Sequence, residues 1–215
     1  MKQLLAGVAI TALIGLAAPA ANAAVILTFG QIGAGDTITG TVNGTATATD
    51  ITGSNIPVDI DEILGGVPVA GFLDLSAASS GAAATAGGFT TQTYTGSFSI
   101  TSAIGGGGTN FLSGTFNDAV FGAGSSLTLS VSNGSPGETA DFTSSVIPLK
   151  DLGNPRGIAL SFSDVHPSVG IDGTTLAAFT SSVAGDFSAN VPEPASLALL
   201  GVGVLGIGFA SRRRR

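Results

Sequence analysis

The sequence predicts an all-β domain, an antiparallel β-sandwich or jelly roll, flanked by an N-terminal signal peptide and a C-terminal transmembrane helix. Three observations lead to this prediction. Stretches in the middle of the chain alternate apolar with hydroxyl-bearing residues, glycine-containing turn signals separate them, and each end of the chain carries an apolar run almost free of charge. Alternation at period two between frequent turns is typical of antiparallel strands.

Residues 1–23 have the composition of a signal peptide. Lys2 is the only charged residue, an apolar run covers residues 4–18, and Ala21, Asn22 and Ala23 form a small-x-small cleavage site. We expect cleavage between Ala23 and Ala24. A second membrane span is the alternative, disfavoured because the run is short and no cationic stop follows it. The chain has no cysteine, which excludes disulfides and a lipid-bearing cysteine.

Residues 24–190 are predicted to form one β-rich extracytoplasmic domain of about ten strands. The clearest alternations put the following residues on common faces: Tyr94, Gly96, Phe98 and Ile100; Leu127, Leu129 and Val131; Ile158, Leu160 and Phe162. Turns are expected at Asn43-Gly44, 105–108, Asn133-Gly134, Asn154-Pro155 and Asp172-Gly173. Residues 76–88 fit a short helix or a loop, and residues 61–66 fit a helical turn.

A five-residue pattern occurs three times, at 94–98, 112–116 and 183–187. It has an apolar residue at its first position, glycine at its third and phenylalanine at its fifth. In a strand the glycine and the phenylalanine share a face, so a neighbouring aromatic ring can cover the glycine. The separations are unequal, which excludes a solenoid or propeller period. We interpret the pattern as core packing, with a repeated ligand platform as the alternative.

The body of the chain is strongly acidic. Residues 24–190 contain two basic residues, Lys150 and Arg156, and thirteen acidic ones, a net charge of −11. Nucleic-acid binding depends on Lys and Arg at the phosphates, so this class of function is excluded. An acidic surface suits solubility and cation binding outside the cell.

Asp59, Asp61 and Glu62 form the most compact group of carboxylates in the sequence. Oxygen ligands suit calcium, although the spacing of an EF-hand loop is missing. Zinc is disfavoured because the chain has no cysteine and a single histidine. The alternative to a calcium site is a solvated acidic loop, and no other cofactor is expected.

No catalytic set stands out, and the chain is not expected to be an enzyme. Ser163, Asp164 and His166 contain the residue types of a hydrolase triad, but no nucleophile elbow surrounds any serine. Glu62 and Glu138 lack the context of a glycosidase pair. Rows of alternating threonines, at 37, 39 and 41 and at 45, 47 and 49, instead predict a hydroxyl-rich surface that could bind sugar or ice, or carry glycan.

The last 25 residues, 191–215, read VPEPASLALLGVGVLGIGFASRRRR. Pro192 and Pro194 enclose Glu193, and the prolines keep the preceding residues out of a helix. Residues 195–210 carry no charge and predict a transmembrane helix of roughly 24 Å, short of the roughly 30 Å hydrocarbon core. Arg212, Arg213, Arg214 and Arg215 provide a cytoplasmic stop. A permanent single-span anchor behind a proline linker is the alternative.

This arrangement of a Pro-Glu-Pro box, a short apolar helix and terminal arginines resembles the PEP-CTERM sorting signal of Gram-negative bacteria. The resemblance implies recognition through Pro192, Glu193 and Pro194 by exosortase, an integral membrane enzyme thought to cut near the box. It also implies inner-membrane anchoring, then release to the cell surface or medium.

Proteins with this signal are associated with exopolysaccharide and biofilm, so a structural or adhesive role beside extracellular polysaccharide is expected. A carbohydrate- or ice-binding module, with or without calcium, is the alternative. A polysaccharide-cleaving hydrolase is the least favoured class.

Overall fold

A computed structural model describes residues 23–33, 37–123 and 127–192 of the chain. Contacts join residues Ala23–Pro192 into one compact unit. The predicted signal peptide before Ala23 and the predicted helix 195–210 lie outside the described residues. Across the part of the chain that is described, no helix is long and apolar enough to span a bilayer.

The described residues form thirteen strands and one 3₁₀ turn. Their bounds are β1 (Ala23–Gln31), β2 (Ile38–Val42), β3 (Thr49–Ile63), β4 (Val69–Ser79), β5 (Ala84–Ala86), β6 (Phe89–Ala103), β7 (Gly107–Ala123), β8 (Leu127–Ser132), β9 (Thr139–Thr143), η1 (Leu149–Asp151), β10 (Gly153–His166), β11 (Ile171–Asp172), β12 (Thr175–Leu176) and β13 (Phe179–Asn190).

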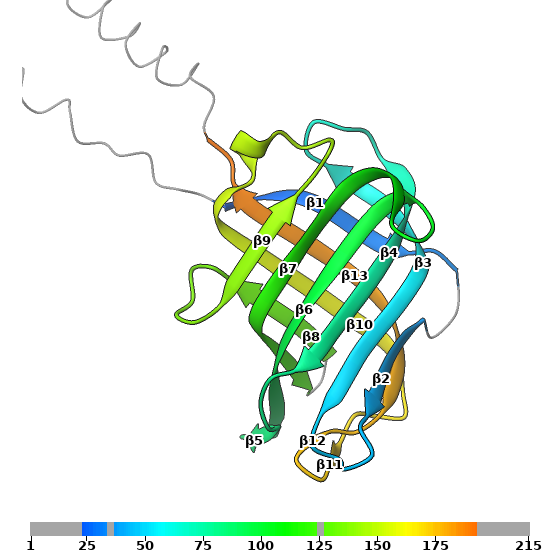
Figure 1. The fold of residues 1–215 in the computed structure, drawn as a ribbon, viewed down its shortest axis with the longest axis vertical. Coiled ribbons are helices and arrows are strands. Elements are labelled where there is room, and N and C mark those ends of the chain that lie inside the picture. The colour runs from blue at the N-terminus through cyan, green and yellow to red at the C-terminus, as the bar shows by residue number, and fades with distance from the viewer. Residues whose placement is uncertain (1–22, 34–36, 124–126, 193–215) are drawn as a thin grey trace, which may run out of the picture. The chain divides into compact units, whose positions relative to one another are not determined.

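Eleven strands belong to one antiparallel sheet with the order β5-β6-β4-β3-β1-β13-β10-β8-β7-β9, and β2 pairs with both β3 and β13. Because β6 also pairs with β7, the sheet closes on itself. Strands β3, β4, β6 and β7 form one layer, which crosses the layer of β1, β13, β10 and β8 (Figure 1). The all-β antiparallel prediction is confirmed. The layers are sandwich-like, but they are parts of one closed sheet and not two separate sheets.

Bulges bend the long strands where they pass between layers. Asn55, Asp118 and Asp164 have positive φ, and each lies where the strand register shifts. In β7, residues before Asp118 pair with β9, whereas residues after it pair with β8. An extra residue on one strand increases local bending and twist. The bulges in β3 and β7 therefore allow these two strands to pair with strands of both layers.

The core fills the space between the layers with aliphatic and aromatic side chains. The ring of Phe187 packs against Phe98 at a centroid distance of 4.5 Å and against Phe29 at 6.0 Å. A second cluster surrounds Phe121, which contacts Tyr94 at 5.6 Å and also Phe162 and Phe179. The buried faces predicted from the alternation in β6, β8 and β10 are confirmed, except that Gly96 is only half-buried.

Two of the three repeated glycines lie beneath aromatic rings. A Cβ on Gly114 would be 3.0 Å from Phe98, and a Cβ on Gly185 would be 2.9 Å from Phe29. The third, Gly96, faces the backbone of β4 instead. The pattern therefore reflects close packing within the closed sheet, as predicted.

Some local predictions need correction. Residues 76–88 contain no helix, because β4 runs to Ser79 and β5 covers Ala84–Ala86. Residues 61–66 complete β3 and then make a turn in which Gly66 N–H donates to Ile63 C=O at 3.0 Å. Asn154-Pro155 lies inside β10, where it interrupts the pairing with β13 instead of forming a turn. The other four expected turns connect strands as predicted.

Candidate functional site

The strands at the two ends of the domain are neighbours. Ala23 pairs with Asn190 and Ala24 pairs with Ala189, so the chain enters and leaves the domain at one place. Cleavage after Ala23 would remove a single pair from this ladder. Val191 packs against the core and Pro192 is exposed. The other predicted processing residues, Ala21, Glu193, Pro194 and Arg212–Arg215, lie outside the described residues.

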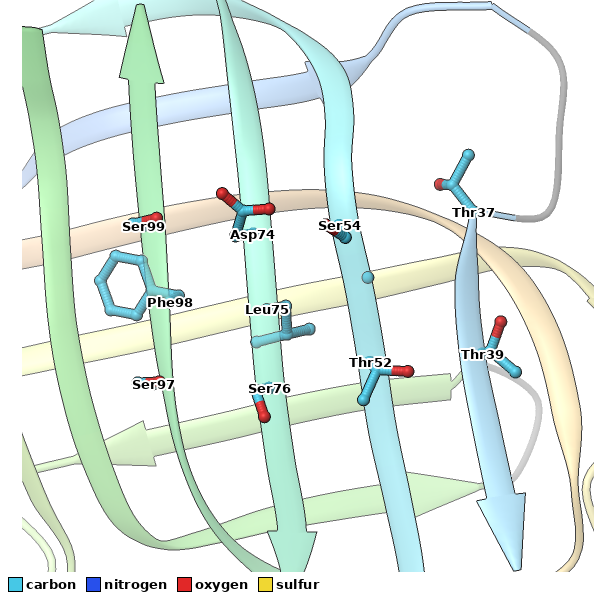
Figure 2. A pocket seen from close by; sticks show the side chains of 11 residues that line it. Thr37, Thr39, Thr52, Ser54, Asp74, Leu75, Ser76, Ser97, Phe98 and Ser99 are labelled. Atoms are coloured by element: carbon cyan, nitrogen blue, oxygen red, sulfur yellow. The ribbon is translucent and has the colours of Figure 1, made fainter. Parts of the chain in front are cut away.

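A pocket of about 530 Å³ opens on the outward face of β2, β3, β4 and β6. We call it the hydroxyl pocket, since its lining residues are Thr37, Thr39, Thr52, Gly53, Ser54, Asp74, Leu75, Ser76, Ser97, Phe98 and Ser99. Leu75 and Phe98 point into the core, so the polar side chains on either side of them in sequence face outward. Figure 2 shows these polar side chains on β2, β3, β4 and β6, with Thr37 just before β2.

Strand register arranges the polar side chains of the pocket in two rows (Figure 2). The first row runs Thr39, Thr52, Ser76 and Ser97, each directly opposite the next. In the second row Asp74 lies opposite Ser99, and Ser54 precedes the bulge at Asn55. Neighbouring strands are roughly 4.8 Å apart, which sets the spacing of the hydroxyls along each row.

Most hydroxyls of the pocket have no hydrogen-bond partner among the described residues. In the described chain the side chains of Thr39, Thr52, Ser76, Ser97 and Ser99 make no hydrogen bond to another protein group. Asp74 is held in place, because its Oδ1 accepts a hydrogen bond from the backbone N–H of Asn55 at 2.7 Å. The pocket therefore offers several free donors and acceptors on a rigid sheet.

The predicted threonine rows behave differently from one another. Thr39 lies in the hydroxyl pocket, and Thr37 lines it while donating to Gln31 Oε1 at 2.7 Å. The first two threonines of the second row are exposed, as predicted, but they lie in a turn and not on a strand. Thr45 and Thr47 contact each other and Asn43 in the β2–β3 turn.

Thr49 of that row is buried. Its Oγ1 lies 2.6 Å from the hydroxyl of Thr175 and donates to the carbonyl of Leu176. The side chains of Asn43, Thr45 and Thr47 hydrogen-bond within the β2–β3 turn, so the period-two pattern there did not indicate a strand.

The three carboxylates proposed to bind calcium all lie on the exposed side of β3. Asp61 and Glu62 both point outward because the register with β1 shifts between Thr28 and Phe29. Over the described ranges, no group of three or more His, Cys, Asp or Glu side chains is placed to hold a metal. Calcium binding at Asp59, Asp61 and Glu62 stays a prediction.

The residues considered for catalysis lie at a β-bulge and in a turn. Asp164 has positive φ in the β10 bulge, between exposed Ser163 and exposed His166. The carboxylate of Glu138 accepts a hydrogen bond from the Ser132 backbone N–H at 2.6 Å and so holds the β8–β9 turn. The expectation that the chain is not an enzyme stays a prediction.

The comparison with known protein families decides what the end of the chain is. A family model of the PEP-CTERM protein-sorting motif matches residues 190–215, which begin at the last residue of β13. This chain carries a PEP-CTERM sorting motif. The PEP-CTERM motif marks an exported protein with a membrane-anchored C-terminal sorting signal that exosortase recognises. No curated protein and no solved structure matches the chain.

Most residues of the hydroxyl pocket were not recognised in the sequence. The alternation of apolar and hydroxyl-bearing residues, which the sequence does contain, indicates the outward positions of a strand. These positions are occupied by Thr52, Ser54, Ser76, Ser97 and Ser99. However, three separate strands contribute them, and only the strand order and register show that they are neighbours.

Proposed function

We propose that this PEP-CTERM protein is a non-enzymatic component of the extracellular matrix, whose β-domain binds neutral polysaccharide through the hydroxyl pocket. The observation that supports the proposal is a set of five hydroxyls in two rows on the outward face of β2, β3, β4 and β6, which have no hydrogen-bond partner among the described residues. A structural or adhesive role follows from holding such a polymer at the cell surface.

The chemistry of the pocket complements a sugar. Each serine or threonine hydroxyl donates one hydrogen bond and accepts others, as sugar hydroxyls do. Asp74 adds an acceptor fixed by Asn55 N–H. The volume of about 530 Å³ falls within the range of roughly 300 to 1,000 Å³ common for small-molecule sites. The pocket opens on the outward face of the sheet, so a polymer need not enter the core to reach it.

Charge favours a neutral polymer over an acidic one. Asp74 is the one charged residue among those that line the pocket, and residues 24–190 carry a net charge of −11. Uronate or sulfate groups would be repelled unless cations accompanied them. Neutral sugars avoid this cost.

The lining of the pocket also supports binding without cleavage. Glycoside hydrolysis normally requires two carboxyl groups on opposite sides of the scissile bond. Among the lining residues, Asp74 is the single carboxylate. A polysaccharide in this pocket would therefore meet hydroxyls and one acceptor, and no general acid paired with a base.

A glycan array probed with residues 24–191 tests the proposal. The variant Thr52→Val with Ser76→Ala removes two pocket hydroxyls, and Thr85→Val with Thr90→Val is the matched control at an exposed pair whose hydroxyls are 2.9 Å apart. Two lost hydrogen bonds of about 0.5–1.5 kcal/mol each predict affinity for neutral glycans roughly 5- to 150-fold weaker, with the control unchanged. Absence of glycan binding, or equal binding by both variants, would contradict the proposal.

A calcium arm of the array separates the alternative. Binding is expected to be the same with added calcium and with a chelator, because the hydroxyl pocket needs no metal. Binding that disappears with the chelator and with Asp59→Asn would instead place the site at Asp59, Asp61 and Glu62.

A further inference from the structure

Large apolar side chains are exposed at the end of the domain where the chain leaves toward the sorting motif. Leu149 and Val67 are the two most exposed large apolar residues of the described chain, at 77% and 75%. Val25 and Val69 are partly exposed at the same end. We call Val25, Val67, Val69 and Leu149 the apolar rim.

Contacts place the apolar rim around the chain exit. Leu64 N–H donates to Ile26 C=O at 2.9 Å, which holds the β3–β4 turn with Val67 beside the start of β1. A Cβ on Gly66 of that turn would be 3.6 Å from Val146, in the segment that leads to η1 and Leu149.

After η1 the chain returns to the exit itself, where Gly153 pairs with Asn190. Figure 1 shows η1 and the β3–β4 turn at the same end of the domain as the end of β13. The rim residues come from β1, the β3–β4 turn, β4 and η1, yet they gather near one point.

The connection to the membrane segment is short. The uncharged run begins at Ala195, five residues after Asn190, the last residue of β13. Five residues span at most about 17 Å even when fully extended. The headgroup region of a bilayer is itself roughly 5–7 Å thick on each side. The exit end of the domain must therefore lie at or near the lipid headgroups while the run is inserted.

The cation at the rim is paired with a carboxylate. Lys150, the single lysine in residues 24–190, follows Leu149, and its side chain is 74% exposed. Its ammonium group contacts Asp151 at 2.7 Å. Apolar side chains that insert at the headgroup boundary are typical of surfaces that bind membranes. The paired ammonium and carboxylate add no net charge to the rim.

We propose that the apolar rim rests on the lipid bilayer as long as the sorting motif anchors the chain. The inference depends on the anchored C-terminal signal and is independent of polysaccharide binding. It means that the domain is held against the membrane in one orientation before processing, with its opposite end, at Phe89 and Ile171, directed away from the lipid.

The absence of cysteine from the chain allows single labels. Two variants report on the rim, Val67→Cys and Leu149→Cys. The matched controls are Phe89→Cys and Ile171→Cys at the other end, where the original side chains are 56% and 45% exposed. Residues 24–215 carrying one polarity-sensitive fluorophore would be inserted into phosphatidylethanolamine–phosphatidylglycerol vesicles and recovered by flotation. Quenching by brominated lipid is then measured for each label.

Labels at 67 and 149 are expected to be blue-shifted and quenched roughly twofold or more above the controls. Equal spectra and equal quenching at all four positions in floated vesicles would overturn the rim contact while leaving anchoring intact. Failure of every labelled chain to float would overturn the anchoring and the rim contact together. Neither result bears on the glycan array, which uses residues 24–191.

Discussion

Gln92 joins the β11–β12 hairpin to the closed sheet, and its replacement by leucine should weaken the whole domain. The side chain is 2% exposed. Its Nε2 donates to Thr175 Oγ1 and to Gly81 C=O, each at 2.8 Å. Its Oε1 accepts from the Leu176 backbone N–H and from the Tyr94 hydroxyl, each at 3.1 Å.

Leucine has a similar size but none of these hydrogen bonds. Gln92→Leu would leave the Leu176 N–H and the Tyr94 hydroxyl buried without this acceptor, and each unsatisfied group costs about 1–3 kcal/mol. We therefore expect the free energy of unfolding to fall by about 2–6 kcal/mol. The hairpin, which closes one end of the core through Leu176, should detach first.

Urea unfolding of residues 24–191, followed by circular dichroism, measures this loss. Thr90→Val is the control, because its hydroxyl contacts Thr85 at the exposed surface and its loss should cost less than about 0.5 kcal/mol. A Gln92→Leu variant within about 1 kcal/mol of the original protein would refute the role given to this buried network.

Three further predictions concern ionisation, packing and processing. Burial raises the pKa of Tyr94 far above its ordinary value. A hydrogen bond with the Thr49 side chain lowers this pKa in part, and the negative charge of Asp50 raises it further. As pH rises, the unfolded chain therefore loses the tyrosine proton first, and the stability of the domain should fall above about pH 10. Tyr94 is the sole tyrosine, so tyrosinate absorbance should appear only when the domain unfolds. Ionisation of the folded domain near pH 10 would contradict this prediction. Gly114→Ala should destabilise the domain by about 1–3 kcal/mol in thermal unfolding, because the added Cβ would meet the Asp141 backbone and Phe98. The control is Gly30→Ala, whose Cβ would meet no atom within 4 Å and which should be neutral. Equal effects of the two variants would rule out the packing argument. Alanine at 192–194 should leave membrane-bound chains that retain residues 212–215, and mass spectrometry showing normal processing would count against recognition of the box.

The sequence was sufficient to predict the strands because their signal is local. In β8 and β10 each apolar position in the alternation is buried, since one face of each strand meets the core. The sorting motif was equally readable, because its residues are contiguous. The turn after Val42 was predicted, although the threonines that follow it were misread, because turn residues and strand residues both include threonine.

Closure of the sheet and the hydroxyl pocket could not be predicted in the same way. Closure depends on β6 pairing with β7 and on bulges at Asn55 and Asp118, whose positions depend on tertiary packing. The pocket depends on register. A shift of two residues between β4 and β6 would keep every side chain on its face but would set Ser76 opposite Thr95 or Ser99 instead of Ser97, and no local pattern separates these registers.

The most direct test of the hydroxyl pocket is retention of the protein in the matrix of living cells. The original chain and the Thr52→Val, Ser76→Ala variant would be produced in the same exosortase-containing strain, and the protein in washed matrix polysaccharide would be compared with that in the wash. We predict that the original protein stays with the polysaccharide and that the variant, processed equally at its tail, appears in the wash. Equal retention of the two proteins would contradict polysaccharide binding through this pocket.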